Sequence, residues 1–299
     1  MRRMLLFLSL AAAAFPSLGA EGFHELRAVP GAPATLADIA AAFRSAPRPA
    51  IANPQGGYGF DYQLIYPVVI NTPGKNGTFY KTDYFVVNER NIDQEILIGF
   101  LEEGVAGSGL GASRFSLKAN TAYAIPDFLG ASGINKSGVG SLLLTTVLPG
   151  VNVPDVNGLV FGGTIVYTNQ PGMTGTTSFY SYAVSPSTIH GLTPAFTPGA
   201  RQNNDYRANF GVVNLDPINP QTFSVDVVGA GSPGHTTVTV PPLSMQYQPI
   251  PSVTPSASGY VFLNFAPSGS ADFPWLPFST TANNVTGDAW ISLGVQFNF

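Results

Sequence analysis

From residue 62 onward, hydrophobic and polar side chains alternate with a period of two, and turn-forming residues interrupt the alternation every few positions. The segments "QLIYPVVINT" and "FYKTDYFVVN" lie on either side of the tight turn "PGKNG", an arrangement that predicts a β-hairpin. Glycine and proline together make up 59 of the 299 residues (33 plus 26), and both residue types disfavour long helices. The pattern therefore predicts an all-β fold of many short antiparallel strands.

One segment near the N-terminus has a helical period instead. In "TLADIAAAFRSA", the apolar residues Leu36, Ile39 and Phe43 fall on one face at helical spacing. Thr35 can cap the first turn, and Asp38 lies favourably within it. We expect a short helix that packs on the first domain, with a partner-binding or tethering helix as the alternative. The following "PRPAIANPQGGYGF" has the composition of a linker.

Two segments echo each other at a distance of 126 residues (214 minus 88). "YKTDYFVVNER" ends near Asn88, and "YRANFGVVNLD" ends near Asn214. The similarity continues in the same order along the chain. The segment "EILIGFL" corresponds to "TFSVDVV", and "GSLLLTTV" corresponds to "GYVFLNFA". Between these pairs, one segment crosses Pro126 and its counterpart crosses Pro249. We interpret this order as an internal duplication and these four residues as its structural markers.

The echoing segments also resemble a known type of protein. The run "YPVVINTPGKNGTFYKTDYFVVN", followed in the second copy by "YRANFGVVN", resembles exported bacterial β-sandwich proteins with tandem Ig-like units. In these proteins an "NGTF-[RK]-T-D" hairpin opens the first unit, and "[YF]-R-[TA]-N-x-G-x-V-N" opens the second. The resemblance covers roughly residues 62 to 299 and implies a fold, but no activity and no catalytic residues. The chain departs from the pattern at Phe85, where Gly211 of the second copy predicts a glycine.

These observations together predict two tandem antiparallel β-sandwich domains of Ig-like type, at residues 55 to 188 and 189 to 299. The junction "HGLTPAFTPGA" contains proline and large apolar residues, whereas flexible linkers are richer in polar residues. We therefore expect a packed interface between the domains, with Phe196, Trp275 and Phe278 as candidates to be buried there. Packed interfaces are not the default for domains within one chain.

The first residues have the order of an export signal. Arg2 and Arg3 precede the apolar stretch "MLLFLSLAAAAF" and the small-residue segment "PSLGA". We expect cleavage after Ala20, which makes residues 1 to 20 a signal peptide and residues 21 to 54 a lead segment that carries the helix and linker. The protein is then exported to the periplasm, the cell surface or the extracellular space. A retained N-terminal anchor is the alternative.

The charge of the chain narrows the classes of partner. Charged residues make up only 10% of the sequence, against roughly 25% in typical globular proteins. A formal net charge of −4 without a basic run argues against nucleic-acid binding. The sequence contains no cysteine, so disulfides and thiolate zinc sites are excluded.

The sequence offers little material for catalysis. His24, His190 and His235 lie in separate loop-like segments, and no serine lies in a "GxSxG" motif. Glu102 and Glu103 are adjacent in a glycine-rich turn, which is typical of a hairpin tip rather than of a glycosidase pair. We therefore expect no enzymatic activity, no catalytic residues and no cofactor.

The repeated asparagines invite two interpretations. Each ends an apolar strand, so we expect Asn88 and Asn214 to close the strand by accepting a bond from the amide two residues on. The alternative is a Ca²⁺ site, because "NERNID" and "NLDPIN" concentrate oxygen donors in the loops that follow. Lys81 and Arg207 are expected on outward faces, solvated or paired, with Asp83 as a candidate partner of Lys81.

Three functions fit these observations. The first is a non-enzymatic exported structural or adhesive protein, whose partner is an unknown protein or glycan at the cell surface. The second is a carbohydrate-binding module that uses exposed aromatic residues, with Tyr58, Phe60, Tyr62 and Trp275 as candidate ligand or interface residues. The third is an outer-membrane β-barrel, because "AWISLGVQFNF" alternates and ends on an aromatic residue. Dense prolines and short strands argue against the barrel, and so against a membrane location of the mature chain.

Overall fold

The structure of the chain is a computed structural model that describes residues 26–45, 61–74, 77–107, 109–130, 133–169, 176–185, 192–229, 233–253, 258–269, 274–284 and 286–296. We call the described residues up to 185 the first half and those from 192 the second half. The first half contains β1 (Arg27–Ala28), β2 (Ala34–Thr35), α2 (Leu36–Ser45), β3 (Gln63–Pro73), β4 (Phe79–Asn88), β5 (Gln94–Glu102), β6 (Gly111–Leu117), β7 (Ala122–Ile125), β8 (Gly138–Val147), β9 (Val160–Asn169) and β10 (Thr176–Tyr182). The second half contains β11 (Ala195–Arg201), β12 (Tyr206–Asn214), β13 (Gln221–Val228), β14 (Gly234–Val240), β15 (Ser244–Pro249), β16 (Tyr260–Ser268), β17 (Trp275–Asn283), β18 (Ala289–Leu293) and β19 (Val295–Gln296). The expected signal peptide lies outside the described residues.

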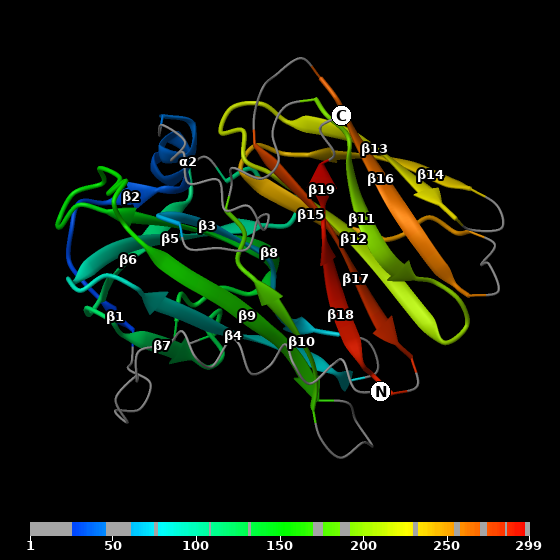
Figure 1. Cartoon of the computed structure of the whole chain (residues 1–299), viewed down its shortest axis with the longest axis horizontal. Coiled ribbons are helices and arrows are strands. Elements are labelled where there is room, and N and C mark those ends of the chain that lie inside the picture. The colour runs from blue at the N-terminus through cyan, green and yellow to red at the C-terminus, as the bar shows by residue number, and fades with distance from the viewer. Residues whose placement is uncertain are drawn as a thin grey trace, which may run out of the picture.

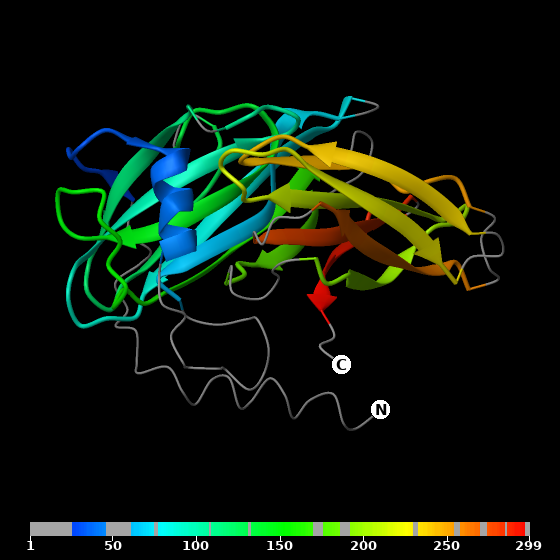
Figure 2. The ribbon, with the colours of Figure 1, turned by 90° about the horizontal axis from the view of Figure 1, so that it is seen from above.

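Helix α2 forms where the sequence predicts it. Its first turn carries reciprocal capping bonds: the Asp38 amide donates to Thr35 Oγ1 at 3.2 Å, and the Thr35 amide donates to Asp38 Oδ2 at 2.8 Å. The buried side chains of Leu36 and Ile39 pack on the sheet beside β5, where a side chain at Gly99 would collide with Leu36. Figure 2 shows the helix lying across the strands of the first half. No helix in the described ranges is long and apolar enough to span a membrane.

The strands form antiparallel sheets, so the predicted all-β fold of antiparallel strands is confirmed (Figure 1). In the first half, the layer β6-β5-β8-β3 and the layer β7-β4-β9-β10 belong to one ten-stranded sheet. Strand β3 joins the layers, because it pairs with β4 only through Thr72–Tyr80 and Pro73–Phe79. The second half has a five-stranded sheet, β14-β13-β16-β11-β19, and a four-stranded sheet, β15-β12-β17-β18.

The two layers of each half face each other across an apolar core. In the first half, the buried rings of Tyr66 on β3 and Tyr84 on β4 lie 5.0 Å apart between centroids. Their hydroxyls are hydrogen-bonded at 3.0 Å, and burial raises the pKa of both phenols well above the usual range. In the second half, Phe223 on β13 packs on Trp275 of β17 with centroids 4.9 Å apart. Aromatic contacts between layers therefore define both cores.

The pairing order is the same in both halves. The layers β6-β5-β8-β3 and β7-β4-β9-β10 correspond strand for strand to β14-β13-β16-β11 and β15-β12-β17-β18. The register corresponds as well. Pro126 directly follows the residue that pairs with position 84, four residues before Asn88 (88 minus 84). Pro249 directly follows the residue that pairs with position 210, four residues before Asn214 (214 minus 210).

The sequence departure at Phe85 has a structural counterpart. Phe85 on β4 pairs with Gly163 on β9, whereas Gly211 on β12 pairs with Phe278 on β17. In the second half a side chain at Gly211 would meet the Phe278 ring at 2.1 Å. Each half thus places one phenylalanine opposite one glycine at this position, but on opposite strands. The Phe278 ring covers Gly211, whereas the ring nearest to Gly163 is that of Tyr180 on β10.

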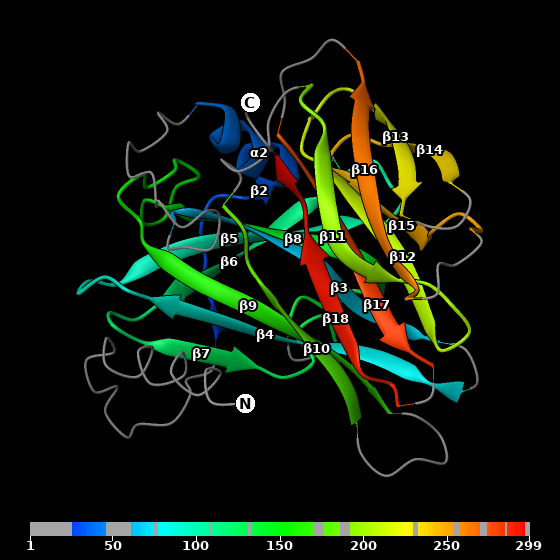
Figure 3. The same ribbon diagram turned by 45° about the vertical axis from the view of Figure 1, so that its right-hand side comes forward.

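The halves contact each other along a junction, which we define as residues 102–107 of the first half and 242–247 of the second. Two backbone bonds cross it, from the Gly104 amide to Met245 O and from the Gly107 amide to Pro242 O, both at 2.9 Å. Ser244 Oγ donates to the Glu102 carbonyl at 2.8 Å. One cluster of buried hydrophobic residues extends from α2 across the junction into the core of the second half. Strand β10 also lies beside β18 (Figure 3).

The sequence-based candidates for this interface take different places. Trp275 lies in the core of the second half, against Phe223. Phe278 is buried on the opposite face of its sheet, where its ring stacks on Tyr247 with centroids 6.0 Å apart. Phe196 is half-buried on β11. Phe278 is therefore on the sheet face that carries the junction residue Tyr247.

Candidate functional site

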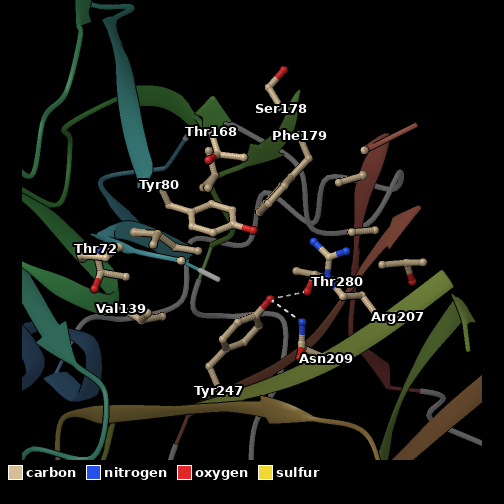
Figure 4. A pocket seen from close by; sticks show the side chains of 18 residues that line it. Thr72, Tyr80, Val139, Thr168, Ser178, Phe179, Arg207, Asn209, Tyr247 and Thr280 are labelled. Atoms are coloured by element: carbon tan, nitrogen blue, oxygen red, sulfur yellow. Dashed lines mark hydrogen bonds between the residues drawn. The ribbon is translucent and has the colours of Figure 1, made fainter. Parts of the chain in front are cut away.

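A cavity of about 210 Å³ lies between the two halves (Figure 4). Its walls come from both halves and combine aromatic rings, aliphatic side chains and hydroxyl groups. The described residues that line it are Ile70, Thr72, Pro73, Gly74, Tyr80, Val139, Val166, Thr168, Ser178 and Phe179 from the first half, and Arg207, Asn209, Tyr247, Thr280, Thr281, Ala282, Gly287 and Ala289 from the second. The cavity is smaller than the roughly 300–1,000 Å³ of drug-sized sites, so it suits a ligand of about one ring.

The course of the strands explains why a space remains here. Successive side chains of a strand alternate between faces, so Tyr80 shares a face with the buried core residue Tyr84. Phe179 and Val166, which are paired across β10 and β9, lie on that same face. At this end of the strands, however, β3 leaves its layer to pair with β4 through two residue pairs, so the layer β6-β5-β8-β3 covers the face only in part. The sheet β15-β12-β17-β18 covers the remainder and encloses the cavity.

The second half contributes a hydrogen-bonded floor. The Tyr247 hydroxyl on β15 lies 2.5 Å from Thr280 Oγ1 on β17 and accepts a bond from Asn209 Nδ2 on β12 at 3.2 Å. Burial raises the pKa of the Tyr247 phenol, although its bonds to Thr280 and Asn209 oppose the rise. The phenol is therefore neutral at physiological pH. Three adjacent strands hold it in one orientation.

The opposite wall is formed by Tyr80. Its ring lies against Gly74, where a Cβ atom would come within 2.5 Å of the ring. Figure 4 shows the hydroxyl groups of Tyr80 and Tyr247 and the guanidinium of Arg207 directed towards the same space, whereas the Ser178 side chain points away. The Phe179 ring lies between Tyr80 and Arg207 in this view.

The charge at the cavity comes from Arg207. Its side chain is exposed, and Nη1 donates to Asn284 Oδ1 at 2.6 Å. The corresponding cation of the first echo, Lys81, pairs with Asp127 at 2.6 Å. This partner differs from the sequence-based candidate Asp83, whose Oδ1 accepts the Asp127 amide instead. Lys81 is thus neutralised locally, and Arg207 makes no ion pair with the described carboxylates.

None of the aromatic residues singled out in the sequence is among the described residues that line this cavity. Tyr58 and Phe60 lie outside the described residues. The side chains of Tyr62 and Trp275 are only 6% and 1% exposed, so both rings lie in the interior. Exposed aromatic side chains of the described first half lie elsewhere, with Phe79 at the start of β4 and two tyrosines on the outer face of β10. Tyr180 and Tyr182 are 40% and 47% exposed there.

The repeated asparagines occupy equivalent, fully buried positions. Asn214 Oδ1 accepts the Asp216 amide at 2.9 Å, and Asn88 Oδ1 accepts the Arg90 amide at 2.9 Å, as expected from the sequence. Each Nδ2 group is directed at backbone carbonyls of the loop and of the strand end beside it. For Asn88 these are the carbonyls of Ile92, Leu117 and Lys118, and for Asn214 those of Asn219, Val240 and Pro241. Each asparagine thus fastens the loop that follows it to the neighbouring strand end by hydrogen bonds, and the two loops correspond to each other.

In the second loop considered for Ca²⁺, the carboxylate oxygens of Asp216 are engaged with the protein itself. Asp216 Oδ1 accepts the amides of Ile218 and Asn219 at 2.8 and 3.0 Å, and Oδ2 accepts the side-chain amides of Asn219 and Gln221. Within the described ranges, no three histidine or acidic side chains gather as they would around a metal ion. Of the three histidines, His24 and His190 lie outside these ranges, and the exposed His235 contacts Asp226 at 2.7 Å.

Comparison with known proteins gives no family: no protein-family model matches the chain, and no curated protein matches it. The resemblance to exported tandem Ig-like proteins therefore stays a prediction, and the antiparallel all-β fold is what is shown. The cavity was not found from the sequence because its residues come from many strands of both halves. One signal did point to it, since Tyr80 and Arg207 lie at the start of the two echoing segments.

Proposed function

We propose that the chain is an exported, non-enzymatic structural or adhesive protein built from two Ig-like β-sandwich units. The units arose by duplication of one ancestral unit. The identical pairing order of the halves, the equivalent asparagines and the equivalent prolines support the duplication. The N-terminal pattern of the sequence supports export. The partner is a protein or glycan at the cell surface.

The observation that carries this proposal is the packed junction. Domains in one chain usually move relative to each other unless the interface is large and hydrophobic. Here an apolar cluster spans the interface, and backbone groups on both sides are hydrogen-bonded. Glu103 Oε1 adds a bond by accepting the Tyr247 amide at 3.1 Å, although burial raises the pKa of that carboxyl. Two units fixed in this way form one rigid spacer.

Replacing Gly107 with alanine tests the packed junction. A Cβ atom at this position would lie 2.3 Å from the Leu243 carbonyl oxygen across the junction, so the halves must shift apart. Overpacking of this kind costs about 1–3 kcal/mol. We expect the wild-type full chain to unfold in one thermal transition, and the Gly107→Ala variant to unfold at a lower temperature.

The matched control is Gly109→Ala, because a Cβ atom at that exposed glycine meets nothing within 4 Å. This control should unfold like the wild type. Equal melting temperatures for both variants and the wild type would show that the junction contributes little, and the rigid-spacer proposal would then fail.

A second candidate function is carbohydrate binding by exposed aromatic residues. Tyr180 and Tyr182 are adjacent on the outer face of β10, with ring centroids 4.6 Å apart, and Phe161 lies 6.1 Å from Tyr182. Neighbouring half-exposed rings on a sheet face suit contact with sugar rings. Partial burial, together with the neighbouring Tyr182, raises the pKa of Tyr180 to about 12, so the phenol is neutral at physiological pH.

If the chain binds carbohydrate through these rings, replacing Tyr180 and Tyr182 together by alanine should weaken binding to an insoluble polysaccharide by at least about fivefold. This factor corresponds to a loss of roughly 1 kcal/mol or more of binding free energy. The control is Tyr260→Ala, because Tyr260 is 49% exposed but lies on the second half. Co-sedimentation across a panel of polysaccharides measures both variants. Binding that survives the double replacement would exclude these rings as the site.

A further inference from the structure

The charge of the cavity between the halves is unbalanced. Among the described residues that line it there is no aspartate, glutamate, lysine or histidine, and Arg207 supplies one positive charge. A guanidinium carries five N–H donors, of which the bond to Asn284 uses one. Because the Arg207 side chain is exposed as well as lining the cavity, a solute can reach it from solvent. The cavity therefore favours an anion.

The first half has a cation at the corresponding position, but there the charge is paired with a carboxylate. Lys81 lies near the start of the first echoing segment, and Arg207 lies near the start of the second. Each lies on the strand of its own half that ends in the buried asparagine. Lys81 has an aspartate partner within its own half, at 2.6 Å. At the corresponding place the second half has a guanidinium directed towards a cavity. Arginine differs from lysine in presenting a planar pair of donors that matches a carboxylate.

The remaining walls specify the body of the ligand. Hydroxyl groups of Thr72, Tyr80 and Thr280 lie around the space, and an apolar ring, Phe179, lines one side. Alternating hydroxyls and ring faces suit a ligand that has both polar edges and C–H faces. A cavity of about 210 Å³ holds one such ring and not a chain of them.

We propose that this cavity binds a sugar acid of one ring, with Arg207 as the group that binds its carboxylate. The hydroxyls of Tyr80 and Thr280 then bond to ring hydroxyls, and the Phe179 ring contacts a C–H face. The site shares Tyr247 with the junction, but Arg207, Phe179 and Thr280 take no part in the junction bonds described above, and the outer aromatic residues do not line the cavity. It can therefore fail without affecting either candidate function.

Titration of the full chain with sodium D-glucuronate, followed by ligand-observed NMR, tests the proposal. A ligand of this size is expected to bind with a dissociation constant of about 1 mM. Neutral D-glucose is expected to bind at least about tenfold more weakly, because it lacks the charged partner. The variant Arg207→Gln should weaken glucuronate binding by at least about tenfold while leaving the weak glucose binding unchanged.

Two further variants locate the binding. Arg27→Gln removes an exposed arginine of β1 that does not line the cavity, so it should bind glucuronate like the wild type. Ala289→Leu places a larger side chain in the cavity wall and should weaken binding of glucuronate. The proposal is overturned if no saturable glucuronate binding occurs, if Arg207→Gln and Arg27→Gln bind equally, or if Ala289→Leu binds like the wild type.

Discussion

Replacing Asn214 with alanine is expected to lower the free energy of unfolding by about 3–5 kcal/mol, because several buried backbone groups lose their partners at once. The side chain is fully buried, and its Nδ2 group lies 3.0–3.1 Å from three carbonyl oxygens. Its Oδ1 atom accepts the Asp216 amide at 2.9 Å. Alanine satisfies none of these groups. The loss therefore greatly exceeds that of one ordinary hydrogen bond.

Urea unfolding of the full chain measures this effect as a lower midpoint at an unchanged slope. Asn88→Ala should cost a similar amount, since Asn88 makes the equivalent bonds in the first half. The exposed Asn157 provides the control, and its replacement by alanine should change the free energy of unfolding by less than about 0.5 kcal/mol. If both Asn214→Ala and Asn88→Ala lowered the free energy of unfolding by less than about 1 kcal/mol, the role of these asparagines in fastening the loops would be contradicted.

Replacing Trp275 with alanine is expected to cost about 3–5 kcal/mol, the usual loss for a large buried ring. The side chain is 1% exposed and packs on Phe223 between the two layers of the second half. A cavity of this size in the core cannot be refilled without displacing the opposite sheet. The measurement is again urea unfolding at constant pH.

The second tryptophan of the chain, Trp290, is the matched control. It is half-buried, lies edge-on to Tyr206, and donates from Nε1 to the Gly199 carbonyl at 3.1 Å. Trp290→Ala should cost only about 1–2 kcal/mol. If Trp275→Ala were no more destabilising than Trp290→Ala, the placement of Trp275 in the core would be wrong.

Much of the local structure could be predicted from the sequence because it depends on short-range periodicity. The segment "FYKTDYFVVN" coincides with β4, and the helix expected at residues 35 to 46 is found at Leu36–Ser45. The capping pair Thr35 and Asp38 is three residues apart, so its contact follows from helix geometry. The alternating segments "EILIGFL" and "TFSVDVV" likewise lie within β5 and β13.

Contacts between distant segments could not be predicted in the same way. The partner of Lys81 is Asp127, which lies 46 residues away in the turn after β7, so no pattern along the chain relates the two. The place of Trp275 depends on which face of β17 it occupies, and a strand with both faces buried has no polar side to decide this. The cavity beside Arg207 depends on how the halves meet, which is a property of the tertiary structure alone.

The exchange of phenylalanine and glycine between the halves bears on how a chain with two similar units avoids misassembly while it folds. Tandem copies are prone to pair strands of one copy with strands of the other. If β4 paired with β17 in the native register, Phe85 and Phe278 would stand opposite each other and compete for one space. If β12 paired with β9, Gly211 and Gly163 would stand opposite each other, and neither would meet the phenylalanine that it faces in the native pairing. Both crossed pairings lose the match of one phenylalanine to one glycine, and only pairing within a copy keeps it.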